Sequence, residues 1–198
     1  MATDKDLHKA FSDELEVWAP VHAWRALGQL KAQPAIEPLI GLFDELIDDD
    51  WIDDELPTVF ALIGPAALPF LANYLSDQTN GKSPLILAAS CISEIWLKNI
   101  TARKKSISIL TKQLAAFDVN DSELNGFLIW FLIDLQATSS IETIREAFRR
   151  DCVDMSIPGD LSCVEFELGL TDKPPQLRLF AEESPAEEKQ YPFNADST

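Results

Sequence analysis

Apolar residues recur along the chain at the spacing of one face of an α-helix, and this spacing appears four times. The first copy, with residues at positions i, i+3, i+4 and i+7, consists of Ile36, Leu39, Ile40 and Phe43. The other copies, the last two with one polar member each, begin at Leu68, Ile107 and Ile141. The spacing predicts four amphipathic helices, and intervals of 32, 39 and 34 residues between their first positions indicate a repeated unit.

A further apolar helix is predicted before each of these four segments, in residues 21–27, 56–63, 85–96 and 124–135. Thr101 and Ser139 or Ser140 are the expected N-caps of the second helices in the last two units. An amphipathic helix cannot bury its apolar face alone, so neighbouring units have to stack. The pattern therefore predicts an all-α fold, an α-α superhelix (solenoid) of about four helical hairpins.

The two ends of the chain differ from the repeats. We expect an N-terminal cap in residues 1–18 with a helix near 3–12, repeats in 19–150, a C-terminal cap in 151–170 and a flexible tail in 171–198. Pro, Glu, Gln and Ser dominate the tail, and such a composition buries too little apolar surface to become ordered. Segment 160–170 fits either a short helix capped by Asp160 or an alternating strand. The helix is favoured because an all-helical stack offers no sheet to join.

Residues 18–148 resemble HEAT-like repeats of the kind found in phycobilisome-lyase-type proteins. The resemblance rests on HAWRALGQLKAQPAIEPLIGLF (22–43), FALIGPAALPFLANYL (60–75) and FLIDLQATSSIETIREAF (131–148). The third unit departs most from the pattern, with Thr111 at a core position. The ending RDCVDMSIPGDLSCVEFELGL also resembles the closing segment of a small bacterial HEAT-like family of unknown function.

This resemblance implies a right-handed superhelix that serves as a protein-binding or scaffold module. It also implies an alternative function, that of a bilin-lyase-like HEAT protein holding a tetrapyrrole in its concave groove. Some HEAT-like proteins carry a cysteine-rich metal-binding extension, but the 198 residues contain no such segment. No metal role is therefore transferred from the resemblance.

The composition restricts the choice of partner. The chain of 198 residues is 46% apolar and has 33 Asp and Glu against 16 Lys and Arg, a formal net charge of −17. This length and apolar content are typical of one globular domain. A strongly negative surface repels phosphate backbones and anionic lipids. A protein partner is therefore expected, and nucleic acid and membrane are not.

Cysteine usage and the N-terminal residues predict a cytoplasmic protein. Cys91, Cys152 and Cys163 are odd in number and widely spaced, which favours free thiols in a reducing compartment. The first residues are acidic where a signal peptide would be apolar. No apolar run approaches the roughly 20 residues that cross a bilayer.

No catalytic motif is found in the sequence. The two histidines, His8 and His22, lie in no metal or nucleophile motif, and the chain contains no GxSxG, P-loop or GxGxxG sequence. A structural role is favoured for both histidines. Neither a catalytic residue nor a cofactor is predicted.

Acidic residues are concentrated in one segment. Between Lys31 and Lys82 lie ten Asp and Glu residues and no Lys or Arg, and eight of the ten fall in residues 44–55. The favoured interpretation is a solvated loop whose carboxylates complement the dipole of the following helix. The alternatives are a partner-docking patch and a Ca²⁺ or Mg²⁺ site. An EF-hand would need a glycine at loop position six, which this segment lacks.

Basic residues are concentrated in the later repeats, at Lys98, Arg103, Lys104, Lys105 and Lys112 and again in the last unit. Since the second helices of a HEAT stack line its concave side, the groove would run from acidic to basic and orient a protein partner. An ordinary solvated helix face is the simpler interpretation.

Tryptophans at helical spacing favour the core, but Trp18 and Trp51 flank predicted helix starts, where an exposed ring would anchor a partner. The charge gradient and this aromatic position together define the candidate partner-binding residues. They are Glu37, Asp44, Asp48, Trp51, Lys112, Arg145 and Arg149.

Overall fold

The computed structural model describes residues 1–9, 15–46 and 51–174. This part of the chain contains nine α-helices and no strand, which confirms the predicted all-α class. The helices are α1 (Trp18–Gln29), α2 (Ile36–Ile40), α3 (Ile52–Ile63), α4 (Leu68–Ser76), α5 (Lys82–Lys98), α6 (Arg103–Leu114), α7 (Ser122–Asp134), α8 (Ile141–Arg149) and α9 (Leu161–Glu167).

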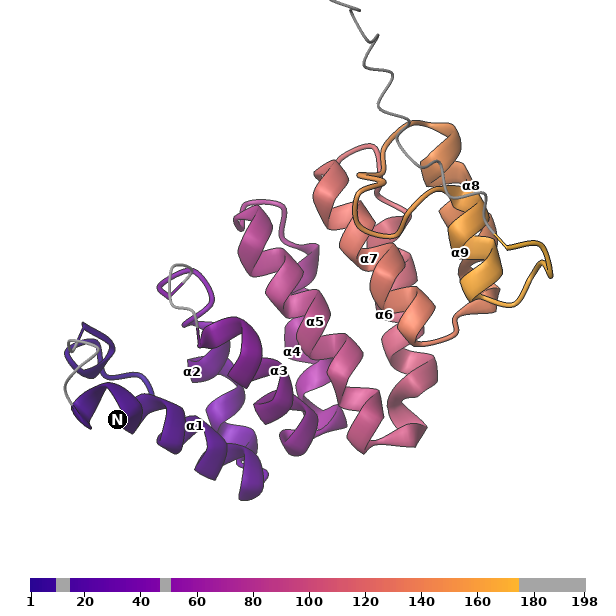
Figure 1. Cartoon of the computed structure of the whole chain (residues 1–198). Helices are drawn as coiled ribbons and strands as arrows, with labels where there is room; N and C mark the ends of the chain where they lie inside the picture. The colour runs from indigo at the N-terminus through magenta and orange to yellow at the C-terminus, as the bar shows by residue number, and fades with distance from the viewer. Residues whose placement is uncertain (10–14, 47–50, 175–198) are drawn as a thin grey trace, which may run out of the picture.

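The helices form two rows that follow the order of the chain. In the odd-numbered row, α1 packs on α3, α3 on α5 and α5 on α7. In the even-numbered row, α2 packs on α4, α4 on α6 and α6 on α8, while α9 packs on α8. Figure 1 views the odd-numbered row, with much of the even-numbered row behind it. Every substantial contact joins helices at most two places apart in chain order.

Each even-numbered helix begins with a three-residue 3₁₀ turn: Gln33–Ala35, Pro65–Ala67, Ile100–Ala102 and Thr138–Ser140. The third helix body starts at Arg103, one turn before Ile107, where the apolar pattern begins. The apolar pattern is interrupted in α6 because two polar side chains, those of Arg103 and Ser106, form hydrogen bonds at positions that carry apolar side chains in the other units. Arg103 donates to the carbonyls of Leu135 and Gln136, and Ser106 donates to that of Ile92 over 2.9 Å.

Of the predicted N-caps, Ser140 does occupy the N-cap position of α8, whereas Ala102 takes that of α6 in place of Thr101. Thr101 lies inside the 3₁₀ turn that precedes α6, and neither α6 nor α8 has a side-chain cap hydrogen bond. Backbone bonds satisfy amides of these turns instead: Ala102 N donates to Asn99 O and Ser140 N to Ala137 O. The Ser140 hydroxyl lies 2.6 Å from that of Thr111 and so links α8 to α6.

The core lies between the two rows, and equivalent helix positions build it. The residue three places after the start of each even-numbered helix is fully buried: Leu39, Leu71, Ser106 and Ile144 are each 0% exposed. The odd-numbered row contributes further apolar side chains that are also 0% exposed, namely Trp24, Phe60, Ile92 and Leu128. The same positions thus pack in every unit, even where the residue is polar.

At the C-terminal end, the structure confirms a helix in the segment that also fitted a strand. Asp160 caps α9 by accepting a hydrogen bond from Cys163 N over 3.1 Å. Gly169 follows the helix at φ 68°, a conformation that favours glycine. The predicted flexible tail falls largely on residues 175–198, which lie outside the described residues.

At the N-terminal end, the described part of the expected 3–12 helix is a 3₁₀ turn, Leu7–Lys9, and residues 10–14 lie outside the description. The indole nitrogen of Trp24 donates to Ala2 O over 2.8 Å, and the ring of His8 stacks on Trp24 at 5.5 Å. His8 therefore packs on the first helix, in keeping with a structural role.

In the described residues, no single helix has the length and hydropathy of a membrane span. One pair bent by 104°, Ile52–Ile63 with Pro65–Ser76, meets both criteria only when its two helices are combined. Leu56 and Phe60 of this pair, together with Leu68 and Leu71, are buried in the core.

Candidate functional site

Three cavities lie side by side along the even-numbered row. The first, between α2 and α4, has a volume of about 530 Å³, and the second, between α4 and α6, has about 610 Å³. The third, between α6 and the 3₁₀ turn that precedes α8, has about 360 Å³. Pro69 and Asn73 line both the first and the second, and Lys112 lines both the second and the third. Because neighbouring cavities share walls, they form one groove.

The first cavity contains carboxylates and aromatic rings, and we call it the acidic cavity. Glu37 and Asp77 line it together with Tyr74 and Phe70, whose ring is 41% exposed. Hydrogen bonds from the hydroxyl and amide of Thr79 lower the pKa of Asp77, which keeps this carboxyl ionised. Such a cavity suits a cationic or aromatic side chain, because the rings offer both apolar surface and a cation–π face.

Tyr74 connects the acidic cavity to a second predicted residue. Its hydroxyl donates to Asp44 Oδ2 over 2.7 Å, and its ring packs edge-on against Phe43 at 5.4 Å. Burial raises the pKa of Tyr74, and the hydrogen bond to Asp44 raises it further. The phenol of Tyr74 therefore stays protonated. Asp44 does not line the acidic cavity itself; it accepts the hydrogen bond that holds Tyr74 in the cavity wall.

The other two cavities bring in positive charge. The central cavity is lined mainly by small and apolar side chains from α4 and α6, such as Ala72 and Ile109, with Lys112 at its α6 side. The third, which we call the basic cavity, is lined by Lys104, Lys112 and the hydroxyls of Thr111 and Ser140. In the described part of the chain, Lys104, Lys105 and Lys112 form no ion pair.

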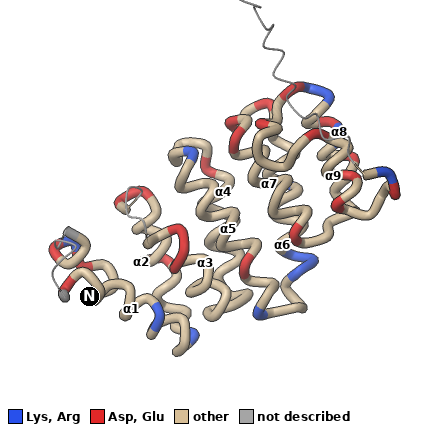
Figure 2. Tube along the Cα trace, viewed as in Figure 1, with Lys and Arg blue, Asp and Glu red and all other residues tan. Residues whose placement is uncertain are grey.

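The lining charges therefore change sign along the groove, from Glu37 and Asp77 at one end to Lys104 and Lys112 at the other. Figure 2 shows acidic residues where α3 begins and basic residues where α6 begins, and acidic residues again around α8 and α9. Among the lining residues, the gradient ends at α6 and does not reach the arginines of α8.

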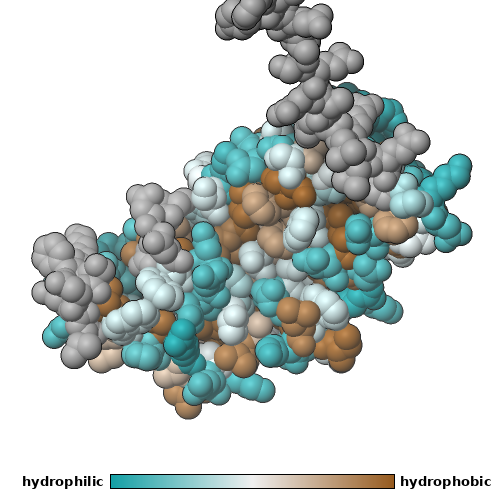
Figure 3. Space-filling view, in the orientation of Figure 1, coloured by the Kyte–Doolittle hydropathy of each residue, from teal (hydrophilic) through white to brown (hydrophobic). Residues whose placement is uncertain are grey.

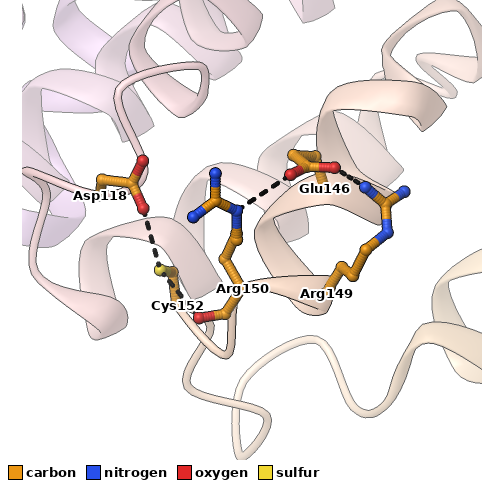
Figure 4. Close-up of polar contacts among 5 residues, drawn as sticks. All are labelled: Asp118, Glu146, Arg149, Arg150 and Cys152. Atoms are coloured by element: carbon orange, nitrogen blue, oxygen red, sulfur yellow. Dashed lines mark hydrogen bonds and ion pairs between the residues drawn. The ribbon is translucent and has the colours of Figure 1, made fainter.

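Two predicted arginines lie outside the three cavities. Arg145 pairs with Glu165 of α9 and with Glu142, both over 2.8 Å, so it fastens α9 to α8. Arg149 pairs with Glu146, which Arg150 also contacts through Nε over 3.1 Å (Figure 4). Their charges are neutralised by nearby carboxylates, so the structure does not support placing either arginine in the groove.

The remaining candidates are Asp48 and Trp51. Asp48 lies outside the described residues. Trp51 is 40% exposed and packs edge-on against Trp18, itself 37% exposed, with ring centroids 4.9 Å apart. The core interpretation of the tryptophans is therefore wrong for this pair and for Trp130, which is 48% exposed. Trp51 does not line any of the three cavities.

A second exposed apolar surface lies on the odd-numbered row. Figure 3 shows hydrophobic side chains gathered between the upper parts of α5 and α7. On α7 the rings of Phe127 and Phe131 stack at 6.1 Å. Nothing in the structure shows what covers this surface, so it is not part of the site.

Groove residues that sequence reasoning missed are Phe70, Tyr74 and Asp77. Their sequence neighbourhood reads as an ordinary amphipathic helix, and only the position of α2 beside α4 brings them next to Glu37. The described residues contain no cluster of three His, Cys, Asp or Glu side chains able to hold a metal ion.

Comparison with known proteins gives no relative. No protein family, curated protein or solved structure matches the chain significantly. A proposal for the function therefore has to rest on the geometry and charges of the groove.

Proposed function

We propose that this chain is a helical-repeat module of the HEAT-like, right-handed superhelical type, and that it binds an extended segment of a partner protein along the even-numbered row. The observation that carries the proposal is the groove itself: three adjoining cavities whose lining changes from acidic to basic. The contacts between successive helices and the 3₁₀ turn before each even-numbered helix support a repeated unit.

The dimensions of the groove suit a peptide in an extended conformation. Packed helices lie about 8–10 Å apart, so a groove from α2 to α8 spans about 24–30 Å. An extended chain covers about 3.3 Å per residue, and eight or nine residues would therefore fill it. Charges of opposite sign at the two ends would fix the direction of the bound segment and accelerate encounter.

Photo-crosslinking from the groove tests this function. Benzoylphenylalanine replaces Asn73, which is exposed and lines two cavities, in the full chain expressed in its source cells. The matched control carries the same group at Thr58, an exposed position on α3 in the other row. We expect a defined set of proteins to be captured from position 73 only. Equal capture from both positions would contradict binding in the groove.

A charge reversal in the groove tests whether the captured proteins bind through its basic residues. Lys112→Glu should reduce capture from position 73 several-fold, because it removes the positive charge shared by two cavities. Lys105→Glu changes the net charge equally on the same helix, but Lys105 does not line the cavities. Capture should be unchanged in this control. The tetrapyrrole alternative has its own readout: if it is correct, biliverdin added to the chain changes its visible absorption.

A further inference from the structure

After Arg178, the C-terminal segment 175–198 has a charge order that complements that of the groove. It contains four glutamates in a short stretch, Glu182, Glu183, Glu187 and Glu188, followed directly by Lys189 and then by two aromatic residues, Tyr191 and Phe193. In the groove, the basic cavity comes first from the α8 end, and the acidic cavity with its exposed Phe70 lies farthest away.

The segment starts at the correct end of the groove. Pro174 is the last described residue and follows α9, which packs on α8. Arg145 joins α8 to α9 through Glu165, and Gln136 donates to Glu167 O at the end of α9 over 3.2 Å. These contacts hold the origin of the segment beside α8, the helix that follows the 3₁₀ turn lining the basic cavity.

The distances between the charged residues of the segment also fit the distance between the basic and acidic cavities. From Pro174 to Glu182 the chain has eight residues, which reach up to about 28 Å when extended. From Glu182 to Lys189 it has seven, or about 23 Å. The basic and acidic cavities lie two helix spacings apart, about 16–20 Å. Glutamates at the basic cavity therefore leave Lys189 within reach of the acidic one.

We propose that residues 175–198 bind in the groove of their own chain, running from α8 towards α2. Glu182 and Glu183 contact Lys104 and Lys112, Lys189 contacts Glu37 and Asp77, and Phe193 packs near Phe70. Lys104 and Lys112 form no ion pair with any described residue, so the glutamates would supply partners for them.

This occupancy would make the segment a competitor of any partner that uses the same groove, a consequence that rests on the proposed function. A partner would have to displace it, and removing its glutamates would strengthen partner binding. Docking itself requires no outside molecule, so it can be tested on the purified chain.

The test is photo-crosslinking within the full chain. Benzoylphenylalanine replaces Phe193, and the crosslinked peptides are identified by mass spectrometry after irradiation at low salt. We expect crosslinks to residues of the acidic and central cavities, at the mass of a single chain, and a loss of most of the yield in 0.5 M NaCl. A mixture of ¹⁴N- and ¹⁵N-labelled chains distinguishes the source: mixed-isotope crosslinks would show binding between two copies and overturn the proposal.

Matched variants identify the contacts. K104E/K112E should lower the crosslink yield at least fivefold, whereas K98E/K105E, with the same change in net charge, should leave it unchanged. Replacing Glu182 and Glu183 by lysine in K104E/K112E should restore the yield, which excludes loss of folding as the cause. Crosslinks scattered over the surface, or a yield unaffected by K104E/K112E, would overturn the proposal. Failure of this test would leave partner capture from position 73 unaffected, so the two proposals fail separately.

Discussion

The hydroxyl of Tyr74 donates a 2.7 Å hydrogen bond to Oδ2 of Asp44, and this bond joins α4 to the turn that follows α2. The two residues are 30 positions apart, and each belongs to a different unit. The bond holds one wall of the acidic cavity in place, because it joins two neighbouring parts of the even-numbered row.

Tyr74→Phe should destabilise the fold modestly while keeping the ring against Phe43. The lost bond is exposed to solvent and its acceptor is a carboxylate, so a cost at the low end of the usual range, about 0.5–1 kcal/mol, is expected. Thermal unfolding followed by circular dichroism should show a decrease in Tm of a few degrees. In a double-mutant cycle with Asp44→Ala, the losses should be less than additive; full additivity would show that the bond contributes nothing.

Gly126→Ala should be clearly destabilising. A Cβ atom at Gly126 would lie 2.8 Å from Ile157 Cδ1 and 3.0 Å from the carbonyl oxygen of Asp154. Overpacking of this kind typically costs about 1–3 kcal/mol, and denaturant unfolding would measure it. Gly41→Ala serves as the control, because its nearest neighbour is 3.5 Å away and its stability should hardly change. Equal stability of both variants would contradict close packing of α7 on the 154–157 turn.

Asn125→Ala should be more harmful than an exposed Asn→Ala substitution. The Asn125 amide is fully buried, donates to Phe117 O over 3.1 Å and to Cys152 O over 2.8 Å, and accepts from Asn120 over 2.8 Å. Alanine leaves these groups without their partner, at a cost of about 3 kcal/mol. Asn73→Ala, on the exposed groove wall, should change the free energy of unfolding by less than about 0.5 kcal/mol. Similar values for the two variants would exclude a structural role for the Asn125 network.

Asp134→Asn should stabilise the protein at neutral pH. Burial raises the pKa of Asp134 and that of Glu94, and the negative charge of Asp134 raises the pKa of Glu94 further. A folded pKa above the unfolded one means that stability is greatest at acidic pH and is lost as pH rises through the folded pKa. The gain from Asp134→Asn should therefore be present at pH 7 and vanish near pH 3.

Urea unfolding of this variant at both pH values measures the effect. Asp172→Asn, at an exposed position after α9, is the matched control and should leave stability unchanged at either pH. A gain that persists at pH 3 would point to a cause other than ionisation.

Helix content and the groove's charged ends were open to prediction because they depend on local patterns. The i, i+3, i+4 spacing around Leu39 and Leu71 marks faces that the structure buries completely. Glu37 and Lys112 were both candidates, and both line cavities of the groove. The run of acids and the run of bases are visible in the sequence alone, so their separation in space follows once the helices pack in chain order.

Other features depend on contacts between distant residues, which periodicity does not reveal. Arg103 and Ser106 stand at positions that carry apolar side chains in the other units. Arg103 donates a hydrogen bond to the carbonyl of Leu135 after α7, and Ser106 donates one to the carbonyl of Ile92 in α5. Arg145 was assigned to the groove because its own helix gives no sign of Glu165, 20 residues later. The sequence pattern does not predict that Tyr74 belongs to the site, because this depends on the packing of α4 beside the turn that contains Asp44.

Because every substantial contact joins helices close in chain order, the interactions that hold the protein together span short stretches of sequence. Chains with such local contacts fold quickly, since little loop-closure entropy is lost before contacts form. They also open from their ends rather than all at once. Amide hydrogens of α3, α5 and α7 should therefore exchange most slowly with solvent, and those of α1 and α9 fastest.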